Sequence, residues 1–247
     1  MMNNSAYQNL KQNHIDNDTK EIANKYLNRP HMGTSFLGYR DIPQLATKNA
    51  RGKRALDYGA GCGYSSQLLY QSGFQVEATD ISDNMLELAR AKYSNIIFKK
   101  AQLGNVPYES NTFDLVLSTF VLFDIPSKDE LIVYLKEAHR VLKKDGIFMA
   151  ITASEIFHLN NWKTISHDIS KNNNIQVGET YQAHLIDANI TFVDFFYDHK
   201  CYLECFKRAN FRIIETHHPK GKESDEIEWG NELYMAPYVT YVCTPDR

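Results

Sequence analysis

The feature that most constrains the fold is a glycine-rich turn at residues 57–63, which reads D-Y-G-A-G-C-G. An apolar strand pattern runs into this turn, and a second one ends on Asp80 about 20 residues later. Gly59 and Gly61 let the backbone pass close to a ligand, and the Asp80 carboxylate can accept hydrogen bonds from both hydroxyls of a ribose. The pattern predicts a nucleoside site at the carboxyl edge of a doubly wound sheet.

The spacing of the glycines argues against a dinucleotide. A pyrophosphate site uses the spacing G-x-G-x-x-G, whereas Tyr64 stands here in the place of the last glycine. Asp57, just before the turn, can instead lie near the ammonium of an amino-acid moiety. The alternative is a tight strand-to-helix turn that binds no ligand.

At residues 57–63 the chain resembles the class I S-adenosylmethionine-dependent methyltransferases, whose first motif reads D/E-x-G-x-G-x-G. Residues 106–108 (V-P-Y) with 113–116 (F-D-L-V), and residues 142–148 (L-K-K-D-G-I-F), are similar to later motifs of that family. Gln102 stands where the family usually carries an Asp that binds the adenine amine, and its amide can still meet adenine. The resemblance covers residues 53–152.

The order of the patterns predicts the fold class. Strands are expected at residues 53–58, 75–80, 96–99, 113–118, 147–152, 211–216 and 238–244, and helices at 64–72, 83–93, 128–142 and 202–210. This order predicts an α/β fold with a Rossmann-like, doubly wound, seven-strand sheet whose last strand is antiparallel. An N-terminal lid and an insertion between strands five and six complete it.

The expected organisation is one methyltransferase domain at residues 21–247 after a flexible segment at 1–20. The domain divides into lid helices at 21–50, broken at Pro30 and Gly33, a cofactor-binding core at 53–152, a substrate insertion at 153–210 and C-terminal strands at 211–247. With 247 residues and 43% apolar content, the chain suffices for one sizeable core.

Charge and composition exclude several classes of partner. The formal net charge is -3 and no block of Lys or Arg is present, so we expect no nucleic acid. No apolar run approaches a membrane span, and the polar start has no signal-peptide core, which favours a cytoplasmic protein without a membrane partner. The four cysteines are scattered, so they are read as structural thiols and no metal is expected. We expect a monomer or a homodimer.

The resemblance implies S-adenosyl-L-methionine as the cofactor and S-adenosyl-L-homocysteine as its product. The residues expected to contact the cofactor follow the strand ends and the glycine turn, and Arg40 is expected to reach the methionine carboxylate from the lid unless it is a surface charge. The predicted cofactor-binding residues are Asp57, Gly59, Ala60, Gly61, Asp80, Ile81, Met85, Gln102, Leu103, Ser118 and Arg40.

The insertion of about 55 residues between strands five and six is longer than a connection needs, which indicates a substrate site. Its aromatic side chains, with others from the lid and the C-terminal part, are expected to line a pocket for a flat acceptor, although each of them can also be core. The predicted substrate-binding residues are Tyr39, Trp162, Tyr181, Phe196, Trp229 and Glu232. The W-x-x-E-x-x-x-x-P spacing from Trp229 is similar to enzymes related to toxoflavin N-methyltransferases.

Methyl transfer is an in-line displacement, so the protein mainly aligns the nucleophile and excludes water, with a base needed only for a protonated nucleophile. Asp124, His158 and His184 are the predicted catalytic candidates. The sequence favours methyl transfer to a nitrogen or oxygen of a small aromatic or heterocyclic molecule. The alternatives are a methyltransferase acting on a protein or other macromolecule and a non-catalytic module that binds the cofactor.

Overall fold

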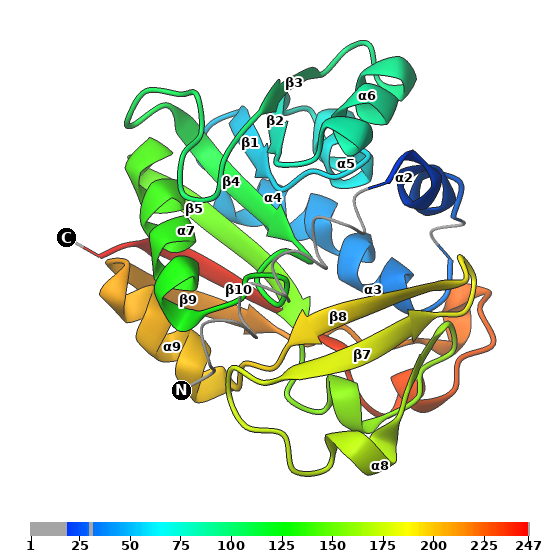
Figure 1. The fold of residues 1–247 in the computed structure, drawn as a ribbon. Helices are drawn as coiled ribbons and strands as arrows, with labels where there is room; N and C mark the ends of the chain where they lie inside the picture. The colour runs from blue at the N-terminus through cyan, green and yellow to red at the C-terminus, as the bar shows by residue number, and fades with distance from the viewer. Residues whose placement is uncertain (1–18, 30–31, 247) are drawn as a thin grey trace.

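The computed structural model describes residues 19–29 and 32–246. The predicted flexible segment, apart from its last two residues, and the predicted helix break at Pro30 lie outside the described residues. A seven-stranded sheet has the order β3-β2-β1-β4-β5-β10-β9, and the strands of a second, three-stranded sheet have the order β6-β7-β8. Figure 1 shows the small sheet packed beside the carboxyl edge of the large one.

The large sheet confirms the predicted topology. β10 pairs antiparallel with both of its neighbours, whereas the pairs from β3 to β5 are all parallel. The direction in which successive strands are added to the sheet reverses between β1 and β4. The carboxyl ends of these two strands therefore form the crevice where doubly wound sheets bind ligands. The strands are β1 (Arg54–Tyr58), β2 (Gln75–Asp80), β3 (Ile97–Lys100), β4 (Phe113–Thr119), β5 (Leu142–Ala153), β9 (Phe211–His217) and β10 (Tyr238–Pro245).

Helices cover both faces of this sheet (Figure 1). α7 (Lys128–Val141) and α9 (His199–Arg208) pack together on one face, and α5 (Tyr64–Gln71) and α6 (Asp83–Lys92) pack on the other. Each of α6, α7 and α9 begins at a residue whose side chain accepts a hydrogen bond from a first-turn amide, as the preference for Ser and Asp at helix starts predicts. These residues are Ser82, Ser127 and Asp198.

Three short helices precede the sheet: α2 (Lys20–Leu27), α3 (Thr34–Arg40) and α4 (Ile42–Asn49). α2 packs against α6, and α3 contacts β10. Gly33 precedes α3 with φ of +81°, and a Cβ there would lie 2.4 Å from Cγ2 of Thr164. The start of α3 therefore depends on glycine and lies against the insertion.

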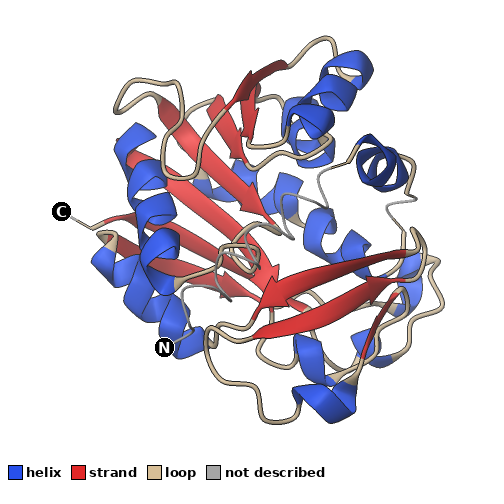
Figure 2. Cartoon of the chain, in the orientation of Figure 1, coloured by secondary structure: helices blue, strands red, loops and turns tan. Residues whose placement is uncertain are grey.

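The insertion is an ordered subdomain rather than a loop (Figure 2). It contains β6 (Ile165–His167), β7 (Thr180–Leu185) and β8 (Ile190–Phe195), with the short helices η1 (Phe157–Leu159) and α8 (Ile169–Asn172). The amide of Phe195 donates to the carbonyl of Phe123, 2.7 Å away, which attaches β8 to the loop after β4. Two more single-turn helices, η2 (Glu223–Asp225) and η3 (Asn231–Leu233), lie between β9 and β10.

One local prediction was wrong. The sequence predicts a strand that begins at residue 147, but β5 begins five residues earlier, at Leu142. Leu142 pairs with Phe113 across a shift in register, and Lys143 forms an ion pair of 2.9 Å with Asp114. These contacts with β4 extend β5 toward the N-terminus beyond the predicted start of the strand.

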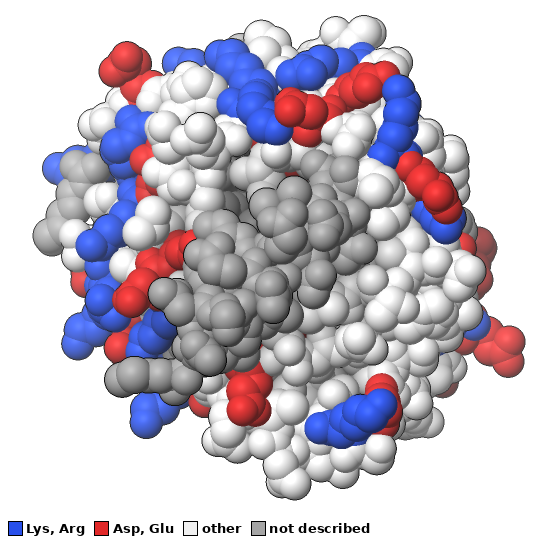
Figure 3. Space-filling model, in the orientation of Figure 1, with Lys and Arg blue, Asp and Glu red and all other residues white. Residues whose placement is uncertain are grey.

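In residues 19–29 and 32–246, no helix is long and apolar enough to cross a membrane. The same part of the chain holds no group of three or more His, Cys, Asp or Glu arranged for a metal ion. On the face in Figure 3, Lys and Arg alternate with Asp and Glu around the edge of the molecule.

Candidate active site

The glycine turn after β1 is held by β2. The amides of Gly59 and Ala60 both donate to the carbonyl of Thr79, at 2.8 and 2.9 Å. Gly59 and Gly61 have φ of +84° and +52°, in the left-handed region that favours glycine. A Cβ on Gly61 would meet nothing within 4 Å, so space is left for a ligand to approach the backbone.

The carboxylate of Asp80 lies between this turn and the start of α6. One oxygen accepts from the amide of Gly61 at 2.7 Å, and the other accepts from the amide of Ser82 at 2.8 Å. A carboxylate has about four lone-pair sites, so both oxygens can accept further hydrogen bonds. The two amides fix the orientation of the group at the crevice.

Asp57 lies beneath the turn and is fully buried. Burial raises its pKa to about 6, although the hydroxyls of Ser65 and Ser66 each donate to its Oδ2 at 2.6 Å and oppose that rise. Among the described residues, its Oδ1 has no hydrogen-bond partner, and neither has the buried Oγ1 of Thr119 at the end of β4. Two buried acceptors without donors beside a glycine turn fit a ligand that brings an ammonium group.

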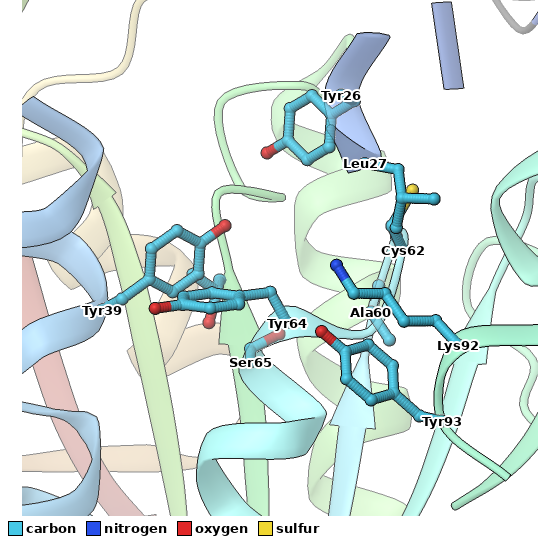
Figure 4. A pocket seen from close by; sticks show the side chains of 12 residues that line it. Tyr26, Leu27, Tyr39, Ala60, Cys62, Tyr64, Ser65, Lys92 and Tyr93 are labelled. Carbon is cyan, nitrogen blue, oxygen red and sulfur yellow. The ribbon is translucent and has the colours of Figure 1, made fainter. Parts of the chain in front are cut away.

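A cavity of about 40 Å³ lies over the turn (Figure 4). That is far below the roughly 300–1,000 Å³ of small-molecule sites, so side chains over the turn must move before a nucleoside can enter. Tyr26 and Leu27 of α2 close it from above in Figure 4. The described residues that line it are Tyr26, Leu27, Tyr39, Gly59, Ala60, Gly61, Cys62, Tyr64, Ser65, Lys92, Tyr93 and Thr119.

Other predicted cofactor residues lie along the same edge. Ile81 is 63% exposed directly after Asp80, and Gln102 is exposed directly after β3. The amide of Ala101 donates to the carbonyl of Asp80 at 2.9 Å, which brings these two segments together. Met85 lies with its sulfur 3.2 Å from that of Cys62, and Leu103 is half-buried against the core.

Two predicted cofactor residues are placed elsewhere. Ser118 is fully buried, and its hydroxyl is 2.9 Å from that of Tyr134, so it supports β4 from inside the core. Arg40 forms ion pairs with Asp41 at 2.9 Å and with Asp225 at 3.1 Å and does not line the cavity. The adjacent acid, Asp41, explains why an arginine of α3 points away from the glycine turn.

Two carboxylates meet beyond the end of β4. Asp124 follows β4, and Asp194 of β8 is brought close by the hydrogen bond from Phe195 to Phe123. Burial raises the pKa of Asp124, and the negative charge of Asp194 raises it further. Burial also raises the pKa of Asp194, against a hydrogen bond from Tyr181. The pKa of each acid is therefore held above its ordinary range, which favours the protonated form of both carboxyls more than in an exposed Asp.

Phe120, at the end of β4, has φ of +61°, which is strained for a bulky residue. Its ring contacts Tyr39 at 5.3 Å and Tyr238 at 4.7 Å between centroids. These contacts hold the Phe120 ring against α3 and β10. Neither Phe120 nor Asp194 was predicted from the sequence, and no local signal marks a positive φ at Phe120.

The two histidine candidates differ. His158 of η1 is buried, and its ring lies 4.5 Å from that of Phe196. Burial lowers its pKa to about 4, so it is neutral at pH 7. His184 lies on the outer face of β7, opposite Tyr181, Ala183 and Leu185, and its Nδ1 is 3.1 Å from Oγ1 of Thr191. The outward position of His184 therefore argues against a catalytic role.

Several predicted substrate residues belong to the core. Trp162 is buried and donates to the carbonyl of Phe157, and Trp229 donates to Asp225 and packs against Gly221. Glu232 is fully buried, and its Oε1 accepts from Oγ1 of Thr34 at 2.8 Å and from the amide of Lys163 at 2.7 Å. These side chains join the lid, the insertion and the C-terminal part instead of lining a pocket. Tyr39, Tyr181 and Phe196 remain beside the site.

The chain is similar to known proteins in the part that holds the glycine turn. Residues 56–150 match the family described as "Methyltransferase domain". Over 131 residues the chain is 34% identical to a demethylmenaquinone methyltransferase of Tropheryma whipplei, covering 51% of this chain and 53% of that protein. Over 115 residues it is 33% identical to the ubiquinone/menaquinone biosynthesis C-methyltransferase UbiE of Haemophilus ducreyi, covering 42% and 43%. The chain thus spans about half the length of the curated relatives that it matches.

Solved structures share the fold over most of the chain. An S-adenosylmethionine-dependent methyltransferase of Clostridium acetobutylicum matches with a TM-score of 0.61 at 16% identity, covering 85% of this chain and 92% of that one. One from Mesorhizobium loti matches with a TM-score of 0.62 at 18% identity, covering 84% and 97%. These structures show a fold that the chain shares with S-adenosylmethionine-dependent methyltransferases, and residues 56–150, which hold the glycine turn and Asp80, match a methyltransferase domain.

Proposed function

We propose that the protein catalyses transfer of a methyl group from S-adenosylmethionine to a nitrogen or oxygen of a small aromatic or heterocyclic acceptor. The observation that carries the acceptor class is the pair of carboxylates, Asp124 and Asp194, beside aromatic rings at the end of β4. A carboxylate whose pKa is raised is a stronger base when ionised, and it can accept a proton from an N–H or O–H group of the acceptor.

The residues fit the cofactor. Asp80 would accept hydrogen bonds from the ribose hydroxyls, and Asp57 Oδ1 with Thr119 Oγ1 would accept from the amino-acid ammonium. The cofactor supplies an electrophilic methyl group with a good leaving group. The protein must therefore align the acceptor with that methyl group and exclude water from the site. Phe120, Tyr39 and Tyr238 would exclude water from the space between the carboxylates and the glycine turn.

A second candidate is methyl transfer to a ring carbon. It is favoured by the relatives, which are named as a demethylmenaquinone methyltransferase and as a C-methyltransferase of ubiquinone and menaquinone biosynthesis. The same two carboxylates would then deprotonate a ring hydroxyl and so activate the adjacent carbon. The cytoplasmic location and the monomeric or dimeric state stay predictions.

The test uses methyl-labelled S-adenosylmethionine with a panel of hydroxylated and nitrogen-containing aromatic molecules, quinols included, and a protein arm. Nuclear magnetic resonance of the product identifies the methylated atom. We expect label in a small aromatic product and a loss of at least tenfold in turnover with Asp124→Asn or Asp194→Asn, with Asp129→Asn on the exposed start of α7 as the control. Label only in protein, or full turnover by both site variants, would contradict the proposal.

A further inference from the structure

We propose that Lys92, at the end of α6, binds the carboxylate of the cofactor's methionine moiety. This inference rests on the proposed function, because it assumes that S-adenosylmethionine occupies the glycine turn. The sequence had assigned this task to Arg40.

The position of Lys92 is the first argument. It lines the cavity over the turn although it comes from the far end of α6, because its long side chain reaches back toward the turn. Figure 4 shows its side chain crossing over Ala60, with the amino group in the space between Tyr26, Tyr64 and Tyr93. The charge of Lys92 also counteracts the rise that burial causes in the pKa of Cys62, so the ammonium acts on the turn itself.

The second argument is that the other nearby cations are engaged. Arg40 is paired with Asp41 and Asp225. Arg29 is paired through its Nε with Asp187 at 2.9 Å; its buried Nη2 has no hydrogen-bond partner among the described residues, but Arg29 does not line the cavity. Of the described residues that line the cavity, Lys92 alone is positively charged. It forms no ion pair within residues 19–29 and 32–246, and its amino group lies 5.5 Å from the ring centre of Tyr93.

The third argument is charge complementarity. The buried acceptors Asp57 Oδ1 and Thr119 Oγ1 lie on the strand side of the turn, and Lys92 comes from the helix side. An amino-acid moiety carries an ammonium and a carboxylate on one carbon, so a site with acceptors on one side and a cation on the other matches it. A ligand without the carboxylate would leave Lys92 in water.

Calorimetry with two ligands tests the assignment. S-adenosylhomocysteine carries the carboxylate, whereas S-adenosyl-3-thiopropylamine has the same adenosine, sulfur and amine without it. Lys92→Met keeps the apolar stem and removes the charge. We expect the variant to bind S-adenosylhomocysteine about 5- to 30-fold more weakly and the amine within twofold of the wild type, because a charge-assisted hydrogen bond at an exposed lysine is lost.

Two further variants serve as controls for the charge and for the position of Lys92. Lys92→Arg keeps the charge and should recover most of the affinity for S-adenosylhomocysteine. Lys100→Met removes an exposed lysine that pairs with Asp83 and should change neither affinity. Unchanged binding by Lys92→Met, or equal loss for both ligands, overturns the role of Lys92 and leaves the proposed function standing. Failure of the wild type to bind S-adenosylhomocysteine overturns both.

Discussion

Replacing Asp80 by alanine should weaken cofactor binding much more than it weakens the fold. The carboxylate is held at the crevice by the amides of Gly61 and Ser82, at 2.7 and 2.8 Å. A hydrogen bond to a charged group contributes roughly 1.5–3 kcal/mol, and the two ribose hydroxyls share one carboxylate. We expect a loss of about 2–4 kcal/mol in binding free energy, which is roughly 30- to 1000-fold in affinity.

The same substitution removes the acceptor of two backbone amides that water can partly replace, so the free energy of unfolding should fall by about 1–2 kcal/mol. Asp83→Ala is the control, because this neighbouring acid is exposed and pairs only with Lys100 in the described part of the chain. Calorimetry with S-adenosylhomocysteine and urea unfolding measure both effects. A lower unfolding free energy with unchanged affinity would refute the ribose role and leave Asp80 as a brace for the glycine turn and the start of α6.

Three more predictions follow from the insertion and the lid. Because His158 has a pKa of about 4 when folded, below its ordinary value of 6.5, its contribution to stability is complete above pH 6.5 and is lost as the pH falls toward 4, by about 2–3 kcal/mol. Urea unfolding of His158→Phe should show a smaller loss between pH 7 and pH 5 than the wild type, and an equal loss would contradict this. Glu232→Ala should lower the free energy of unfolding by about 2–4 kcal/mol, because it leaves the Thr34 hydroxyl and the Lys163 amide without their acceptor. Glu232→Gln should lower the free energy of unfolding by less. Equal effects of the two substitutions would argue against a stabilising role of these hydrogen bonds. Amide hydrogen exchange in residues 20–29, 32–41 and 157–198 should slow when S-adenosylhomocysteine and an acceptor bind. Unchanged exchange would contradict closure of these segments over the ligands.

Local patterns were sufficient for the large sheet. The strand β4 is a largely apolar run, and the helices between the strands begin at Ser82 and Ser127, so the hydrophobic pattern and the helix caps predict the same elements. The early start of β5 was not predicted because it depends on pairing between Leu142 and Phe113, which a local pattern does not contain. The strands of the insertion were not predicted for a similar reason. β6 has only three residues and is defined by its pairing with β7.

In the site, too, residues from one local motif could be predicted and residues brought together by long-range contacts could not. Asp57, Gly59 and Asp80 lie in one motif, so their meeting at the crevice could be predicted from spacing alone. Asp124 and Asp194 come from segments 70 residues apart, and only the contact between β8 and the loop after β4 brings them together.

Residue type alone was also a poor guide to role. Arg40 had the right charge for a carboxylate, but its neighbour Asp41 neutralises it. Trp162 and Trp229 had the right rings for a pocket, but their indole nitrogens donate to Phe157 and Asp225 inside the core.

The central claim is that the glycine turn and Asp80 bind S-adenosylmethionine and not a dinucleotide. Titration calorimetry of the full chain with S-adenosylhomocysteine and, separately, with NAD tests it most directly. The account predicts saturable, one-to-one binding of S-adenosylhomocysteine and no heat of binding with NAD. Binding of NAD without any response to S-adenosylhomocysteine would contradict it.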